Sequence, residues 1–140
     1  MRKTVLWLIR HGEPEEAMRG RCYGRLDAAL SAAGCRQIEC VAARLSRERL
    51  TAIYASPRRR TTASAEIVAK RHAIGVAMEP ALREIDFGDF EGRTYEEIST
   101  ELNIPINSIG AILSRARKKL RSDVKNPPPR IDPKKFQGET

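Results

Sequence analysis

Two arginines, a histidine and a glutamate occur in an order that suits phosphoryl transfer. Arg10 and His11 directly follow the apolar run of residues 4–9. A histidine that attacks phosphorus needs an accessible ring, cations around the phosphoryl oxygens and an acid that protonates the leaving oxygen. Arginine donates forked hydrogen bonds to phosphate, so Arg10 and Arg60 are the candidate clamp. Glu84 is the candidate acid. Taken singly, each residue could be an ordinary surface charge, but their order predicts a site centred on His11.

Three short apolar runs predict the strands of a parallel sheet. They are residues 4–9 (TVLWLI), 51–55 (TAIYA) and 75–78 (GVAM), and helical patterns separate them. Strands that alternate with helices are typical of a mostly parallel sheet, in which continuous apolar strands are buried. Ligands of such sheets bind beyond the carboxyl ends of the strands. His11 is therefore expected at the edge of the sheet where a ligand binds.

Two serines predict where the intervening helices begin. Ser31 is expected to cap the first helix, and Ser56 is expected to cap the second, with Pro57 in its first turn. Arg60 then falls near the N-terminus of the second helix, where free backbone amides and the helix dipole favour an anion. The segment 82–92 is rich in acids and glycine and is predicted to form an ordered loop.

The charge of the chain is unevenly distributed. The 140 residues carry a net charge of +8, and residues 99–140 hold 9 of the 26 basic residues but only 4 of the 18 acidic ones. A nearly balanced globular part followed by a basic segment favours a polyanionic partner for that segment. A solvated basic face would explain the charge as well.

Composition narrows the remaining possibilities. No apolar run is long enough to cross a membrane, and the run after the basic N-terminus is too short for a signal peptide, so a cytoplasmic protein is expected. The cysteines, at positions 22, 35 and 40, form no CxxC pair and complete no zinc site with the two histidines. Reduced thiols and no metal are therefore expected.

Four motifs stand in a characteristic order along the first part of the chain. They are LIRHGE at 8–13, RCYGRLD at 21–27 followed by Leu30-Ser31 and Gly34, YASP at 54–57 followed by Arg60, and LREIDFGDFEG at 82–92. Residues 4–98 thus resemble the N-terminal half of the histidine phosphatase superfamily, which comprises the phosphoglycerate-mutase-like enzymes, and especially the alpha-ribazole phosphatase-like branch.

The resemblance implies both a fold and a reaction. The fold is α/β, a truncated three-layer sandwich with a mostly parallel sheet. The reaction is hydrolysis of a phosphorylated small molecule through a phosphohistidine on His11, with Glu84 as general acid and no cofactor. The resemblance also places five residues around the phosphate: Arg10, Gly12, Tyr23, Gly24 and Arg60.

The sequence departs from this family in one major respect. Family members carry a second catalytic histidine well beyond the acidic loop, and the only other histidine here is His72. His72 precedes the run at 75–78, so it is expected at the edge of the sheet opposite His11. Arg58 and Thr61 also stand where the family usually has leucine and alanine. A weakened phosphomonoesterase is the first hypothesis.

A second resemblance begins where the first one ends. Residues 94–121 resemble the helix-turn-helix of region four in bacterial sigma factors, with a recognition helix that starts near Asn107. Such a helix would lie in the major groove of DNA with its cations near phosphates. The candidate DNA-contacting residues are Ser108, Arg115, Arg117, Lys118 and Lys119. A basic amphipathic helix that simply packs on the sheet is the alternative.

The domain prediction follows from these two resemblances. Residues 1–93 form an incomplete histidine-phosphatase-like part, 94–122 a helix-turn-helix part, and the proline-rich 123–140 a disordered tail. The alternative function is that of a DNA-binding, sigma-factor-like transcription protein whose partners are DNA or RNA polymerase, with no membrane partner. A fusion that hardly folds is the third possibility.

Overall fold

The computed structural model describes residues 4–112 and 115. The chain divides into two compact units, Met1–Thr94 and Tyr95–Thr140. Apart from short 3-10 turns at Glu16–Met18 (η1), Pro80–Leu82 (η2) and Gly88–Phe90 (η3), the first unit contains α1 (Ala32–Leu45), β1 (Ile53–Ala55), α2 (Arg59–Ala69) and β2 (Val76–Met78). The predicted loop at 82–92 accordingly has no strand and only short turns.

Helix α1 begins and packs as the sequence predicts. The Ser31 hydroxyl accepts a hydrogen bond from the backbone N–H of Gly34 at 2.9 Å, which satisfies one free donor of the first turn. Ile38, Ala42 and Leu45 recur at helical spacing and are buried. Together with Val68 of α2 they form the core of this unit.

Helix α2 begins later than predicted. Its N-cap is Arg58, in extended conformation, and not Ser56. The carbonyl of Arg58 accepts the first hydrogen bonds of the helix, from the backbone N–H groups of Thr61 and Thr62. The Thr61 hydroxyl also donates to the Ser56 carbonyl, so residues 56–58 form a turn ahead of the helix. Arg60 still lies in the first turn, as expected.

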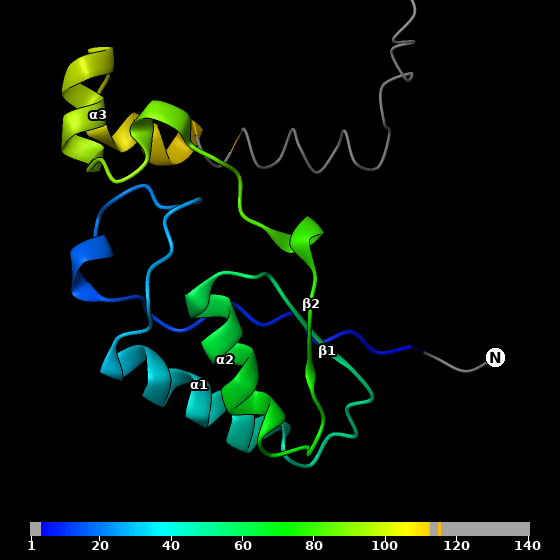
Figure 1. Ribbon diagram of the computed structural model, residues 1–140. Coiled ribbons are helices and arrows are strands. Elements are labelled where there is room, and N and C mark those ends of the chain that lie inside the picture. Colours follow the sequence, from blue (N-terminus) through cyan, green and yellow to red (C-terminus); the bar gives the residue numbers. More distant parts are fainter. Residues whose placement is uncertain (1–3, 113–114, 116–140) are drawn as a thin grey trace, which may run out of the picture. The chain divides into compact units, whose positions relative to one another are not determined.

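The predicted strands at 51–55 and 75–78 are present as β1 and β2. They pair in parallel, with Ile53 opposite Val76 and Ala55 opposite Met78. Helix α2 packs against both strands, and α1 packs against α2 (Figure 1). The α/β character is therefore confirmed, and α1, β1, α2 and β2 follow one another in the predicted order, although the ladder holds only two strands among the described residues.

The strand predicted at 4–9 is wrong. Residues 4–9 are irregular, and Val5, Leu6 and Leu8 are 70%, 80% and 94% exposed. An apolar run forms a strand only when a neighbouring strand takes up its backbone hydrogen bonds. Within residues 4–112 and 115, β1 and β2 pair with each other and neither pairs with this run. The composition is that of a buried strand, but no ladder is formed.

The core of the first unit can be tested at Ile38, which is 2% exposed. We expect Ile38→Val to lower the free energy of unfolding by about 1 kcal/mol, because a buried methylene is lost. Urea denaturation measures this change. Cys40→Ala, at an exposed position of α1, is the matched control and should leave the denaturation midpoint unchanged.

The second unit contains α3 (Tyr95–Leu102), as predicted. Asn103 has a left-handed φ of 50°, which a small polar residue tolerates, and residues 103–105 separate α3 from further helix at 106–112. Ile98 and Ile109 are buried. Most of the predicted second helix after residue 112, and the whole predicted tail, lie outside the described residues. No described helix is long and apolar enough to cross a membrane.

Candidate active site

His11 is fixed through its two neighbours and not through a strand. The backbone N–H of Gly12 donates to the Ser64 hydroxyl of α2 at 3.2 Å, and that of Glu13 donates to Gln37 of α1 at 2.9 Å. A Cβ atom on Gly12 would overlap the backbone of Gly34 in the first turn of α1, so only glycine permits this approach. The two helices therefore position His11 although residues 4–9 form no strand.

One hydrogen bond fixes the tautomer of the His11 ring. The Nδ1 atom lies 2.7 Å from the carbonyl oxygen of Gly12. A carbonyl oxygen can only accept, so Nδ1 carries the hydrogen in this bond. The neutral ring then has its lone pair on Nε2, which is the atom that could attack phosphorus.

The surroundings of His11 favour the neutral ring. Partial burial lowers its pKa below the ordinary value of 6.5, and the positive charges of Arg60 and Arg10 lower it further. The hydrogen bond to Gly12 and the negative charge of Glu84 act in the opposite direction without reversing the shift. A pKa below 6.5 favours the neutral ring of His11 at neutral pH.

Arg60 is buried beneath the loop 23–26. It is 2% exposed and donates to the carbonyl oxygens of Leu26 at 2.7 Å, Gly24 at 3.1 Å and Tyr23 at 3.4 Å. Its guanidinium also lies 5.1 Å from the centre of the Tyr23 ring, a cation–π arrangement. The sequence predicts Arg60 as part of a phosphate clamp, and in the structure Arg60 also stabilises the loop 23–26.

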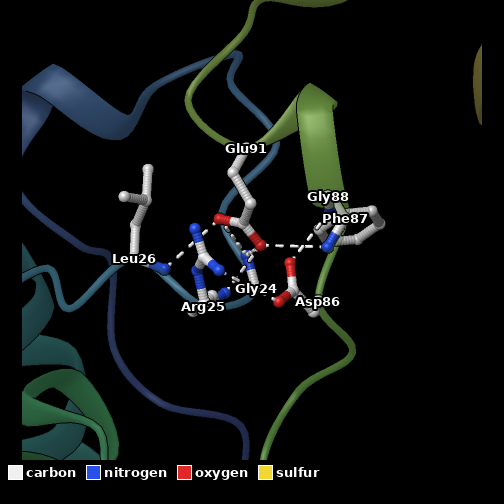
Figure 2. Close-up of polar contacts among 7 residues, drawn as sticks. All are labelled: Gly24, Arg25, Leu26, Asp86, Phe87, Gly88 and Glu91. Carbon is white, nitrogen blue, oxygen red and sulfur yellow. Dashed lines mark hydrogen bonds and ion pairs between the residues drawn. The ribbon is translucent and has the colours of Figure 1, made fainter.

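Glu91 holds the same loop from its other side. Its carboxylate accepts hydrogen bonds from the backbone N–H groups of Gly24, Arg25 and Leu26, and also from that of Phe87 (Figure 2). Partial burial raises the pKa of Glu91, but these four donors outweigh it and hold the pKa below its ordinary value. Glu91 lies within the 82–92 motif, but the sequence alone gives it no separate role.

The other predicted site residues lie around His11. Arg10 and Glu84 are exposed, and both lie close enough to shift the pKa of His11, Arg10 downward and Glu84 upward. The negative charge of Glu84 also raises the pKa of Arg60, against the larger lowering by burial. The centre of the Tyr23 ring lies 6.4 Å from that of His11. The structure thus brings the nucleophile, the two arginines and the candidate acid to one place, while their roles stay predictions.

His72 is not part of this group. It lies in the turn between α2 and β2, where the chain enters the parallel ladder. The charged groups that act on His11 come from residues 10, 60 and 84. Within residues 4–112 and 115, no group of three or more carboxylate, histidine or cysteine side chains is placed to hold a metal.

The four hydrogen bonds to Glu91 predict an acid-sensitive loop. A carboxyl whose pKa is depressed in the folded state stabilises the fold above its unfolded-state pKa, and the stabilisation is lost as pH falls through the folded pKa. We expect the urea midpoint to decrease as pH is lowered below about 4.5, the ordinary value for glutamate. The decrease should be smaller in Glu91→Gln. Glu39→Gln, at an exposed position of α1, should keep the full decrease; equal slopes in all three proteins would contradict this assignment.

Comparison with known proteins identifies the family. The sequence profile of the Histidine phosphatase superfamily (branch 1) matches residues 6–112. The chain therefore belongs to the histidine phosphatase superfamily, as the motifs around His11 predicted. The match continues through α3 into the following helix, and it covers the first part of the segment that resembles a sigma factor. That second resemblance stays a sequence-based prediction.

Individual relatives agree with this assignment. The chain is 38% identical over 96 residues to a Proteus mirabilis protein named "Probable phosphoglycerate mutase GpmB", covering 69% of this chain and 45% of that one. The solved structure of a mycobacterial glucosyl-3-phosphoglycerate phosphatase matches with a TM-score of 0.62 and 30% identity, covering 65% of this chain and 43% of that one. A candidate alpha-ribazole-5′-P phosphatase of Escherichia coli matches at 28% identity with a TM-score of 0.61, covering 66% and 47%. The chain spans less than half the length of these relatives.

Proposed function

We propose that this chain transfers a phosphoryl group from a phosphorylated small molecule to His11 and then to water. The observation that carries the proposal is the 2.7 Å contact between Nδ1 of His11 and the Gly12 carbonyl, which leaves Nε2 with the lone pair in the neutral ring that the lowered pKa of His11 favours. Arg10 and Arg60 supply positive charge beside it, and Glu84 supplies a carboxyl group. These are the groups that phosphoryl transfer through histidine requires.

The proposed reaction has two steps. In the first, Nε2 of His11 bonds to phosphorus, the ester P–O bond breaks, and protonated Glu84 gives its proton to the leaving oxygen. In the second, the oxygen of a water molecule bonds to phosphorus, the P–Nε2 bond breaks and returns its electron pair to His11, and the carboxylate of Glu84 takes a proton from that water as inorganic phosphate leaves. The arginines stabilise the negative charge on the phosphoryl oxygens in both steps.

We propose that this chain by itself turns over more slowly than family members that carry a second catalytic histidine. The chain contains only two histidines, and His72 does not act on His11. Loss of one positioned donor to a transition state typically lowers the rate about 10²–10³-fold. The names of the relatives favour a phosphorylated metabolite as substrate, because they describe phosphatases and a phosphoglycerate mutase.

The test is covalent labelling followed by turnover. The purified chain is incubated with ³²P-labelled acetyl phosphate, and acid-labile, base-stable label is mapped by mass spectrometry. Label on His11 and release of inorganic phosphate support the proposal. Label confined to His72, or no labelled histidine at all, would remove it.

A second candidate function is DNA binding through residues 94–121. The observation that favours it is the helix, short turn and helix of residues 95–112, in which the backbone N–H of Ser108 donates to the Pro105 carbonyl. Arg115 is helical and exposed, whereas Arg117, Lys118 and Lys119 lie outside the described residues. In this proposal those cations contact phosphates, the partners are DNA or RNA polymerase, and the protein acts in the cytoplasm.

Salt dependence tests this second candidate. Binding to a duplex should weaken as salt rises, and alanine at Arg115, Arg117 and Lys118 together should reduce the log–log salt slope by about 2.7, since each phosphate contact contributes about 0.9. Fluorescence anisotropy measures the affinity. An unchanged slope in the triple variant would contradict DNA binding by this segment.

A further inference from the structure

The loop 23–26 is held on both sides by two charged side chains of opposite sign. The carbonyl oxygens of Tyr23, Gly24 and Leu26 accept hydrogen bonds from Arg60. The N–H groups of Gly24, Arg25 and Leu26 donate to Glu91. Charge-assisted hydrogen bonds are shorter and stronger than neutral ones, so the conformation of the loop is set by this pair.

Glu91 also connects this loop to the segment that carries Glu84. Its Oε1 atom accepts from Arg25 N at 2.7 Å and from Phe87 N at 3.1 Å, so one oxygen joins the two segments (Figure 2). A Cβ atom on Gly24 would overlap the Ile85 carbonyl, which shows how closely the two backbones approach. Arg25 and Asp86 form an ion pair at 3.4 Å across the same junction.

We propose that Glu91 is a positioning residue of the phosphoryl-transfer site, which fixes Arg60 and Tyr23 relative to the Glu84 segment. The inference rests on the proposed function. Glu91 acts through two backbone segments. By binding three N–H groups of the loop 23–26, it fixes the loop carbonyl groups that hold Arg60. By binding the N–H of Phe87, it fixes the backbone of residues 84–87. Its role is to keep Arg60, the proposed phosphate-binding cation, and Glu84, the proposed acid, correctly placed relative to His11.

A neutral amide cannot replace this carboxylate. The side-chain oxygen of glutamine can accept at most part of the four hydrogen bonds, and its NH₂ group would face N–H donors. Glu91→Gln is therefore expected to release the loop without changing the size of the side chain. Glu91→Asp keeps the charge and is expected to recover part of the function. Glu39→Gln, on the exposed face of α1, is the matched control.

Three measurements on the full chain test the proposal. Hydrogen exchange of the amides of residues 24–26 and 87, taken together, should accelerate at least about tenfold in Glu91→Gln, since the single amide oxygen cannot accept from all four. The dissociation constant for inorganic phosphate, measured by calorimetry, should rise about tenfold. The rate of His11 phosphorylation at saturating phosphodonor should fall further than phosphate affinity does, because the acid is misplaced as well. Glu91→Asp should lie between Glu91→Gln and the unmodified chain.

The outcomes separate this inference from the proposed function. If the unmodified chain binds phosphate and labels His11, and Glu91→Gln does both equally well, Glu91 is not a positioning residue and only this inference is overturned. Faster exchange with unchanged phosphate binding and labelling would also show that Glu91 is not a positioning residue, because its carboxylate would then stabilise the loop without affecting the site. An unmodified chain that neither binds phosphate nor labels His11 overturns the proposed function, and this inference with it. Equal changes in Glu39→Gln would also overturn it, since that carboxylate lies away from the loop.

Discussion

Replacing His11 with alanine is expected to lower the rate of phosphoenzyme formation by at least about 10³-fold, because no other group in the site can form the bond to phosphorus. The imidazole has its Nε2 lone pair free and its Nδ1–H bound to the Gly12 carbonyl. Alanine removes the nucleophile and leaves the backbone contacts of Gly12 and Glu13 with the two helices in place. Rapid-quench measurement of ³²P incorporation determines the rate.

Two controls make this result specific. His72→Ala removes the other histidine, which lies in the turn before β2, and should label at the rate of the unmodified chain. With acetyl phosphate as donor, the leaving acetate needs no proton from Glu84, so the rate should rise with pH through a value below 6.5 and then stay level, since the pKa of His11 is lowered and only the neutral ring attacks. A rate that continues to rise above pH 7, or equal loss in both histidine variants, would count against His11 as the nucleophile.

Replacing Arg60 with alanine is expected to have the largest effect on stability, about 3 kcal/mol or more. The guanidinium is 2% exposed and donates to three carbonyl groups of the loop 23–26. Without it the carbonyl groups of Tyr23, Gly24 and Leu26 lose this donor, and buried polar groups without a partner are costly. In a unit of this size the change corresponds to a fall in Tm of roughly 10–20 °C. Phosphate binding should be lost as well.

Arg59→Ala is the matched control for this prediction. Arg59 precedes Arg60 in the first turn of α2 and is exposed. Its backbone N–H donates a 2.7 Å hydrogen bond to Asp27, which alanine preserves. Its Tm should change by no more than a few degrees. If calorimetry gives both variants the same Tm, the burial of Arg60 does not stabilise the loop.

Local sequence signals predicted the elements that depend on local contacts. Ser31 specifies the start of α1 through its own hydroxyl, and the spacing of Ile38, Ala42 and Leu45 specifies the buried face. The apolar runs at 51–55 and 75–78, with helical patterns between them, predict the strands β1 and β2 that the structure contains. The family motifs predicted that His11, Arg60 and Glu84 would meet, and the structure brings these residues together.

Features that depend on distant partners could not be predicted in this way. The run at 4–9 has the composition of a buried strand, but pairing requires a neighbour that composition does not supply. Ser56 looks like an N-cap, yet its carbonyl accepts from Thr61 and the helix begins three residues later. Glu91 looks like any loop carboxylate, because the donors that it binds lie more than sixty residues earlier at positions 24–26.

The exposed run at the start of the chain has a consequence for how the protein behaves in solution. Residues 5–9 are uninterrupted Val, Leu, Trp, Leu and Ile, without a charge or a proline, and Leu8 is 94% exposed. A segment of this kind, with unpaired backbone, is a template for intermolecular β-sheet. Self-association should therefore increase steeply with protein concentration, and Leu8→Lys should reduce it by placing a charge within the run.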